Sequence, residues 1–282
     1  MPTALETGGD PLGAAWFVDW HVEPGEKAVG VGLGLLRAAQ RTVAAMLTLE
    51  GSADTQRILP RLGWQQASAP VTALLPLSRL YITDYARRHV PSGFAALAPL
   101  AGQAGRVWFV PRRPPALAGA QLVDVTRFPS DYDEVWAARC AEFAPAMSRT
   151  SQYLNYLCAD YPSGGYRLQL ARLSNAVVGH LVTFVDHDRT GLQRGRIVDL
   201  LWPTEKPALL DWMVASACWQ LDEAGVDYVL CTASRGDLKA ALDRAHFRVR
   251  NTVPIWYHRL PSGTPDPERW HITYLDCDRA YR

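Results

Sequence analysis

The chain has 282 residues, of which 48% are apolar and 20% are charged, with a formal net charge of +1. Such a composition is typical of a globular protein, and the length suits one large domain or two smaller ones. A nearly neutral chain carries no broad basic surface, so we expect neither nucleic acid nor a membrane as a partner.

Strand and helix patterns alternate through the first half of the chain. Residues 14–22 (AAWFVDWHV) predict a strand that ends before Pro24, and a glycine-rich stretch then leads into a helix through Gln40. Residues 78–102 predict a mixture of helix and loop. Three further segments carry local patterns: a strand over 42–50, a helix over 53–63 that Gly63 caps, and a strand over 69–77.

A stretch rich in proline and glycine, residues 110–120 (VPRRPPALAGA), separates this half from a more regular second half. The elements predicted there are a strand over 120–128, helices over 130–143 and 151–161, a hairpin over 166–188 that turns at Ser174-Asn175, a strand over 194–203, a helix over 206–225, a strand over 227–234, a helix over 235–247, and strands over 248–260 and 270–276 that finish the sheet.

Three glycines at alternate positions, Gly30, Gly32 and Gly34, stand where a helix should begin. Each costs a helix about 1 kcal/mol relative to alanine. Their absent side chains would let a ligand approach the backbone, and the N–H groups at a helix N-terminus favour phosphate. The spacing fits neither the dinucleotide fingerprint nor the P-loop. A purely structural turn is the alternative interpretation of the glycines alone.

The residues around these glycines narrow the choice. The pattern Val22-x-Pro24-x-x-Lys27-x-x-Gly30-x-Gly32 resembles the pyrophosphate loop of the GNAT superfamily of acyl-CoA-dependent N-acyltransferases, with Lys27 in the place of the usual Arg or Gln. Further on, residues 58–64 (ILPRLGW) resemble the segment that follows the family's next helix. The second half of the chain resembles the family in its element order and in residues 241–247 (ALDRAHF).

The resemblance implies a mixed α+β fold of two GNAT-like units, each a central mixed β-sheet flanked by helices. The first unit, residues 1–118, carries the glycine-rich loop and is expected to be partial, because few residues precede its loop strand. The second unit, residues 119–282, is expected to be complete. Its loop is degenerate, since Pro203, Glu205 and Pro207 replace the glycines and would obstruct or repel a pyrophosphate.

The resemblance also implies a co-substrate, acetyl-CoA or another acyl-CoA, held by the first unit. Its pyrophosphate would lie on the loop from Lys27 to Gly34, and its thioester would lie beside the strand end from Trp20 to Val22. The predicted cofactor-binding residues are Trp20, Val22, Lys27, Ala28, Val29, Gly30, Val31, Gly32 and Gly34. No metal is implied.

Two side chains are candidates for removing a proton from the attacking amine. Strand alternation places Asp19 and His21 on one face, where either could act as a general base. A solvent-facing strand surface is the alternative interpretation. The family's usual acid, a tyrosine, is replaced by Leu59 in the first unit and by Leu242 in the second, and neither can donate a proton.

Other polar residues carry weaker signals. The run Asp186-His187-Asp188 at a hairpin end is expected to be a solvated turn rather than a metal site, and His180 is expected to be a hydrogen-bonded core or cleft residue. Near the C-terminus, His271, Asp276 and Asp278 are expected at the surface.

The leading hypothesis is therefore an acyltransferase that acts on the amine of a small molecule. The first alternative is a degenerate GNAT-like protein that binds a ligand or partner without catalysis. The second is a Fem-type aminoacyl transferase, which would need a basic surface for tRNA that this composition does not favour. Five widely spaced cysteines without CxxC pairs and the lack of a secretion signal predict reduced thiols and a cytoplasmic location, while a homodimer is left open.

Overall fold

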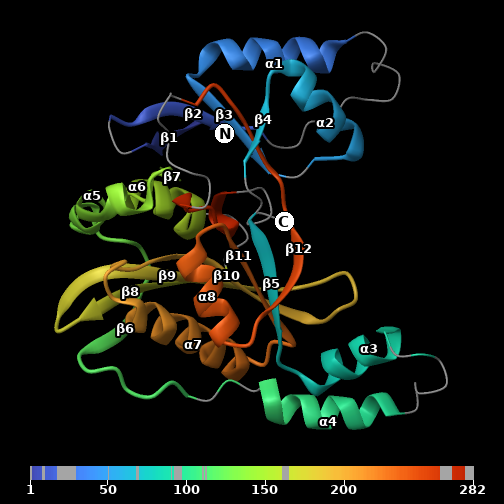
Figure 1. Cartoon of the computed structure of the whole chain (residues 1–282). Coiled ribbons are helices and arrows are strands. Elements are labelled where there is room, and N and C mark those ends of the chain that lie inside the picture. Colours follow the sequence, from blue (N-terminus) through green and yellow to red (C-terminus); the bar gives the residue numbers. More distant parts are fainter. Residues whose placement is uncertain are drawn as a thin grey trace.

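A computed structural model of the chain describes residues 2–7, 10–17, 30–49, 51–67, 70–89, 91, 97–109, 111, 113–160, 165–260 and 269–276. Its strands form two mixed β-sheets, and helices pack against them (Figure 1). The predicted mixed α+β class is confirmed.

The first half of the chain supplies short strands and helices, most of them close to the predicted ranges. In chain order they are β1 (Pro2–Glu6), β2 (Leu12–Trp16), α1 (Val31–Thr42), β3 (Ala45–Leu49), α2 (Ala53–Ile58), η2 (Leu59–Leu62), β4 (Gln65–Ala67), β5 (Val71–Pro76), α3 (Arg79–His89) and α4 (Ala98–Phe109). Strands β1 and β4 were not predicted. Gly63 ends η2 in the left-handed conformation (φ 78°), as its capping role predicted. Helices α3 and α4 pack on each other and extend away from both sheets (Figure 1).

The second half follows the predicted order up to its last strands. Its elements are β6 (Ala120–Val125), α5 (Tyr132–Phe143), β7 (Ala146–Met147), α6 (Ser151–Leu154), η4 (Asn155–Ala159), β8 (Tyr166–Leu173), β9 (Ala176–His187), β10 (Gln193–Leu201), α7 (Pro207–Glu223), β11 (Tyr228–Ala233), α8 (Gly236–Arg244), β12 (Arg248–Thr252), β13 (Ile255–His258) and η6 (Tyr274–Asp276). The β8–β9 hairpin turns at Ser174-Asn175, where both residues have positive φ, as predicted.

The two sheets exchange a strand. The first sheet has the order β4-β13-β3-β2-β1-β7, and the second has the order β12-β5-β11-β10-β9-β8-β6. Strand β13, from late in the chain, therefore lies between two strands of the first half, with Trp256 opposite Thr48 of β3 and Gln66 of β4. Strand β5, from the first half, lies between two strands of the second, with Ala73 opposite Cys231 of β11. The halves 1–118 and 119–282 are thus joined through both sheets.

The exchange corrects the prediction of a single strand over 248–260. That segment is two strands in different sheets, because Pro254 has no amide to continue a ladder and the chain changes direction there. The Val253 amide instead donates to the carbonyl of Pro70 (2.8 Å), which precedes β5. The same proline that ends β12 lets the chain cross to the first sheet.

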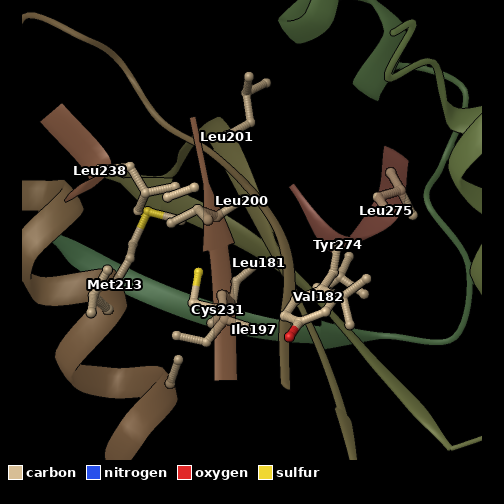
Figure 2. Close-up of a cluster of buried hydrophobic side chains, with 14 of the residues drawn as sticks. Leu181, Val182, Ile197, Leu200, Leu201, Met213, Cys231, Leu238, Tyr274 and Leu275 are labelled. Carbon is tan, nitrogen blue, oxygen red and sulfur yellow. The ribbon is translucent and has the colours of Figure 1, made fainter. Parts of the chain in front are cut away.

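The second sheet is covered on both faces. Met213 of α7 and Leu238 of α8 lie near Ile197 and Cys231 on one side, and Tyr274 of η6 lies near Val182 on the other (Figure 2). The side chains of all six are at least 96% buried. A fully buried aliphatic side chain contributes about 1.5–3 kcal/mol to stability, so this double layer is the main core.

The predicted strand over 270–276 is wrong. Only His271 makes an isolated bridge, to Ala146, and η6 follows it. The Thr273 amide donates to the Asp276 carboxylate (2.9 Å), and the Asp276 amide donates to the Thr273 carbonyl (3.3 Å). These local bonds close a tight turn in place of a ladder.

Two observations bear on membranes and redox chemistry. None of the helices among the described residues combines the length and the apolar character that a membrane span requires. Four cysteines in the described part of the chain, Cys140, Cys158, Cys218 and Cys231, are free thiols.

Candidate functional site

Helix α1 begins where the glycine-rich stretch ends. Gly30 occupies its N-cap with φ of 70°, a left-handed conformation that glycine adopts without strain. The first helical hydrogen bond runs from the Gly34 amide to the Gly30 carbonyl (2.9 Å), so the amides of Val31, Gly32 and Leu33 precede that ladder. No residue of the first turn is acidic. The helix therefore presents amide donors and the positive end of its dipole, the features that bind phosphate.

Two of these glycines have no described atom close to the position of a side chain. A Cβ built at Gly30 or Gly34 would meet no atom of the described residues within 4 Å. Gly32 is buried in α1. Since the Gly34 amide is already bonded within the helix, Gly34 contributes space rather than a donor.

Seven of the predicted site residues lie outside the described part of the chain: Asp19, Trp20, His21, Val22, Lys27, Ala28 and Val29. Strand β2 leads toward them. The Phe17 amide at its end donates to the Leu47 carbonyl of β3 (2.8 Å), so these two parallel strands are still paired there. The roles of the seven residues stay predictions.

The second motif, residues 58–64, holds α1 against the first sheet. Leu59 is fully buried and packs in a cluster with Leu36 of α1, so its side chain points into the core. Trp64 lies 6.1 Å from Phe17 and 5.7 Å from His258 between ring centroids. Burial lowers the pKa of His258, and neighbouring Arg259 lowers it further. No sequence signal marked His258, because the strand exchange alone brings it here.

The corresponding loop of the second half is already occupied by a carboxylate. Glu142 of α5 accepts hydrogen bonds from both the amide (3.1 Å) and the hydroxyl (2.8 Å) of Thr204. The Lys206 amide is bonded internally to the Pro203 carbonyl (2.9 Å). The carboxylate of Glu142 thus takes the place that a bound anion would have in the loop before α7.

The two strands beside this loop separate toward their ends, and residues 270–276, which we call the wedge, lie against them. Strands β10 and β11 pair in parallel as far as Ile197 and Cys231, after which β10 bulges before Asp199. The segment before η6 lies along the end of β11, where the Ser234 hydroxyl accepts from the Ile272 amide (2.7 Å). Helix η6 contacts both β10 and β11, so the chain itself fills the space between them.

A buried ionic network holds this wedge in place. Arg149 donates from Nε to Asp199 (2.8 Å) and from Nη2 to Asp276 (2.6 Å), and all three side chains are fully buried. Burial would raise the pKa of Asp199, but the charge of Arg149 and the hydrogen bond from His180 together outweigh it and hold that pKa well below its usual range. The Thr273 hydroxyl also donates to Asp199 (2.7 Å). The network therefore ties β10 to the segment that carries η6.

Two histidines complete the network. His180 donates from Nε2 to Asp199 (2.9 Å), because a carboxylate only accepts, and its Nδ1 lies 2.5 Å from the Tyr132 hydroxyl. The interpretation of His180 as a hydrogen-bonded core residue is confirmed. His271 is only 1% exposed and lies 3.6 Å from Asp199, beyond hydrogen-bond distance. The expected surface positions of His271 and Asp276 are therefore wrong, since both belong to this network. Asp278 lies outside the described residues.

The run Asp186-His187-Asp188 ends β9. Asp186 pairs with Arg194 (2.5 Å) and Arg196 (2.8 Å), and Asp188 accepts from the Tyr228 hydroxyl (2.9 Å). Within the described residues, no group of three or more His, Cys, Asp or Glu side chains is arranged to hold a metal ion.

Comparisons with known proteins address the fold directly. No protein-family model matches the chain, and no curated protein matches its sequence. Among solved structures, the chain is similar to Saccharomyces cerevisiae N-myristoyltransferase with bound myristoyl-CoA, at a TM-score of 0.65 and 12% identity over 94% of this chain and 66% of that one. It is also similar to a GCN5-related N-acetyltransferase from Anabaena variabilis, at a TM-score of 0.59 and 14% identity over 91% of this chain and 57% of that one.

The chain has the GNAT fold. The predicted resemblance and fold class are thereby confirmed. Sequence identities of 11–14% show a shared fold and nothing finer. The chain spans about two-thirds of the length of the myristoyltransferase and less of the acetyltransferase.

Two segments of this fold run from a strand through a loop into a helix: β2 to α1 and β10 to α7. In the first, α1 is capped by Gly30 and carries no acidic residue in its first turn. The second is closed by Glu142 and by the segment that carries η6. The first thus has a glycine-capped helix N-terminus where the second has a carboxylate.

Proposed function

We propose that the protein is an acyl-CoA-dependent N-acyltransferase that holds the acyl-CoA pyrophosphate at the N-terminus of α1. The observation that carries this proposal is the contrast between the two loops of a GNAT fold. The amides of Val31, Gly32 and Leu33 precede the first bond of the α1 ladder, and the first turn of α1 has no acidic residue, whereas the Thr204 amide is bonded to Glu142. The myristoyl-CoA bound to the yeast neighbour supports an acyl-CoA as the co-substrate.

The proposed reaction is direct transfer to the amine of a small molecule. The amine nitrogen attacks the thioester carbonyl, a C–N bond forms, the C–S bond breaks, and CoA leaves as the thiol after taking up a proton. Asp19 and His21, which strand alternation places on one face, are the proposed bases that remove the proton from the attacking ammonium. Amides near Trp20 to Val22 would polarise the carbonyl.

A charge test at Gly34 separates acyl-CoA binding from folding. Helix side chains lean toward the N-terminus, so a glutamate at this position would bring its carboxylate toward the proposed pyrophosphate site. We expect Gly34→Glu to weaken acetyl-CoA binding about tenfold or more relative to Gly34→Gln, because the two side chains differ only in charge. Isothermal titration calorimetry with acetyl-CoA and a longer acyl-CoA measures the difference.

The same glutamate should not harm the fold. An acidic residue near a helix N-terminus stabilises the helix by about 0.3–1 kcal/mol, so the melting temperature of Gly34→Glu should match or exceed that of Gly34→Gln. Equal affinities of the two variants for acyl-CoA would contradict the proposed position of the pyrophosphate.

Binding without turnover is the second candidate function. Leu59 and Leu242 replace the family's tyrosine, and both are at least 99% buried in the core, so neither could assist the departing thiolate. Release of free thiol from acyl-CoA in the presence of a broad amine panel would exclude this candidate. Loss of that release in Asp19→Asn or His21→Gln, with binding retained, would identify the base.

A further inference from the structure

A half-open cavity of about 510 Å³ lies on the second sheet, on the face that carries η6. A Cβ at Gly195 would contact Leu221 of α7, so the flanking residues Arg194 and Arg196 project from the opposite face. The wall of the cavity includes Tyr274 of η6 and Arg250 of β12. The cavity therefore lies beyond the wedge, away from α7 and α8.

Positive charge exceeds negative charge in this cavity. Four arginines line it, against two aspartates that already have partners. Asp186 accepts from both Arg194 and Arg196. Asp188 accepts from the amides of Thr190 (2.8 Å) and Leu192 (3.2 Å) and from two hydroxyls.

The remaining arginines, Arg189 and Arg250, form no ion pair with any residue in the described part of the chain. Both are exposed at the opening of the cavity. Their guanidinium groups each offer several donors to an incoming oxyanion.

The deepest arginine is held rigidly. The side chain of Arg196 is 4% exposed, and its guanidinium lies 5.6 Å from the ring of Phe184 and 5.8 Å from the ring of Tyr274. Burial lowers the pKa of Arg196, and neighbouring Arg194 lowers it further. An anion that enters the cavity would therefore stabilise the charged form of Arg196.

We propose that this cavity binds a small molecule through a carboxylate or phosphate group. Arginine forks match the planar carboxylate and the phosphate oxygens in geometry as well as in charge. The volume is that of a small-molecule pocket, and the net charge of +1 for the whole chain offers no extended basic surface for a polyanion. The proposal is independent of acyl-CoA binding, which rests on α1 of the first sheet.

The test compares two arginines of the same strand. Arg250 lines the cavity, whereas Arg248, two residues away on β12, does not and pairs only loosely with Asp243 (3.9 Å). Calorimetric titrations with inorganic phosphate and with succinate, at constant ionic strength, are carried out on the whole protein, on Arg250→Gln and on Arg248→Gln. Both variants lose one exposed charge, so both should fold, which circular dichroism verifies.

We expect saturable binding of at least one probe, and the tighter of the two identifies the group that the cavity prefers. Arg250→Gln should weaken that binding about tenfold or more, because a charge-assisted hydrogen bond is lost, and Arg248→Gln should change it less than twofold. The proposal is overturned if neither probe saturates or if the two variants weaken binding equally. Acetyl-CoA affinity should stay the same in Arg250→Gln, so the two proposals can fail separately.

Discussion

Asp199 carries its charge where no side-chain atom is exposed to solvent. It is stable there because Arg149, His180 and Thr273 together satisfy both of its carboxylate oxygens. Such a buried network is costly to break, since removing one partner leaves the others charged and unpaired. The network links Asp199 of β10 to Thr273 and Asp276, so it holds the segment that carries η6 against the second sheet.

Replacement of Asp199 should therefore be severe. We expect Asp199→Asn to lower the free energy of unfolding by about 3–5 kcal/mol, because Arg149 keeps only Asp276 as a counter-ion. Urea unfolding measures the loss. The control is Asp124→Asn, which removes an ion pair with Arg167. The side chain of Asp124 is 60% exposed, so this change should lower the free energy of unfolding by about 1 kcal/mol or less.

His271 should make stability depend on pH. Burial lowers the pKa of His271 below its ordinary value of 6.5, although Asp199 partly offsets the effect. The unfolded chain then binds a proton at a higher pH than the folded chain does. The free energy of unfolding should fall as the pH drops through about 6.5 toward the folded pKa, by at most about 1.4 kcal/mol for each pH unit.

His271→Gln should remove that part of the pH dependence, whereas His187→Gln, at an exposed position, should leave it unchanged. Denaturant unfolding of the three proteins at several pH values between 5 and 8 gives the comparison. An unchanged slope in His271→Gln would show that another group is responsible. Asp199 acts in a separate window, because a lowered carboxylate pKa costs stability only below about pH 4.

Among the elements, the start of β9 depends on one close backbone approach. A Cβ at Gly179 would lie 1.9 Å from the Leu201 carbonyl oxygen, and backbone cannot move aside as a flexible side chain can. We expect Gly179→Ala to destabilise the protein by about 3 kcal/mol or more. The control is Gly13→Ala on β2, where nothing in the described structure lies within 4 Å and the change should be small. Thermal unfolding of both variants tests the difference, and similar melting temperatures would contradict it.

Local patterns predicted most elements but not every conformation. The turn at Ser174-Asn175 and the long helix α7 follow from residues close in sequence, so periodicity and turn chemistry located them. The prediction of a strand over 270–276 was wrong. All residues of this segment are buried, and burial is equally compatible with a strand and with a compact turn. Its turn is set by bonds between Thr273 and Asp276 and by the distant Arg149, which periodicity does not report.

At the scale of the whole molecule, sequence patterns could not predict the exchange of β5 and β13. Pairing between strands from opposite halves leaves no periodic signal, and either sheet could have been completed by its own strand. Only Pro254 gave a local hint, since proline rarely continues a strand. The glycine-rich loop was predictable because glycine and helix patterns are local, whereas the closure of the second loop by Glu142 is a contact between distant segments.

The exchange predicts that neither half folds alone. Without β13, strand β4 has no partner in its sheet, and without β5 strand β12 has none. We expect fragments 1–118 and 119–282, produced separately, to bind a hydrophobic dye and to unfold without a sharp transition. Coexpressed fragments should form a stable complex. As a control, the whole chain cleaved after folding within residues 113–118 should stay associated and folded. A separate fragment that melts as sharply as the whole protein would contradict this prediction.

Strand β13 also imposes an order on synthesis. While the ribosome makes the chain, strands β1 to β4 emerge early, yet the strand that lies between β3 and β4 is translated only after β12. The nascent first half must therefore wait with an open gap in its sheet, exposed to chaperones and proteases, until β13 has left the exit tunnel. Pairings this distant along the chain make folding slow, so yield in the cell should respond to translation speed and chaperone supply more than to the stability of the finished molecule.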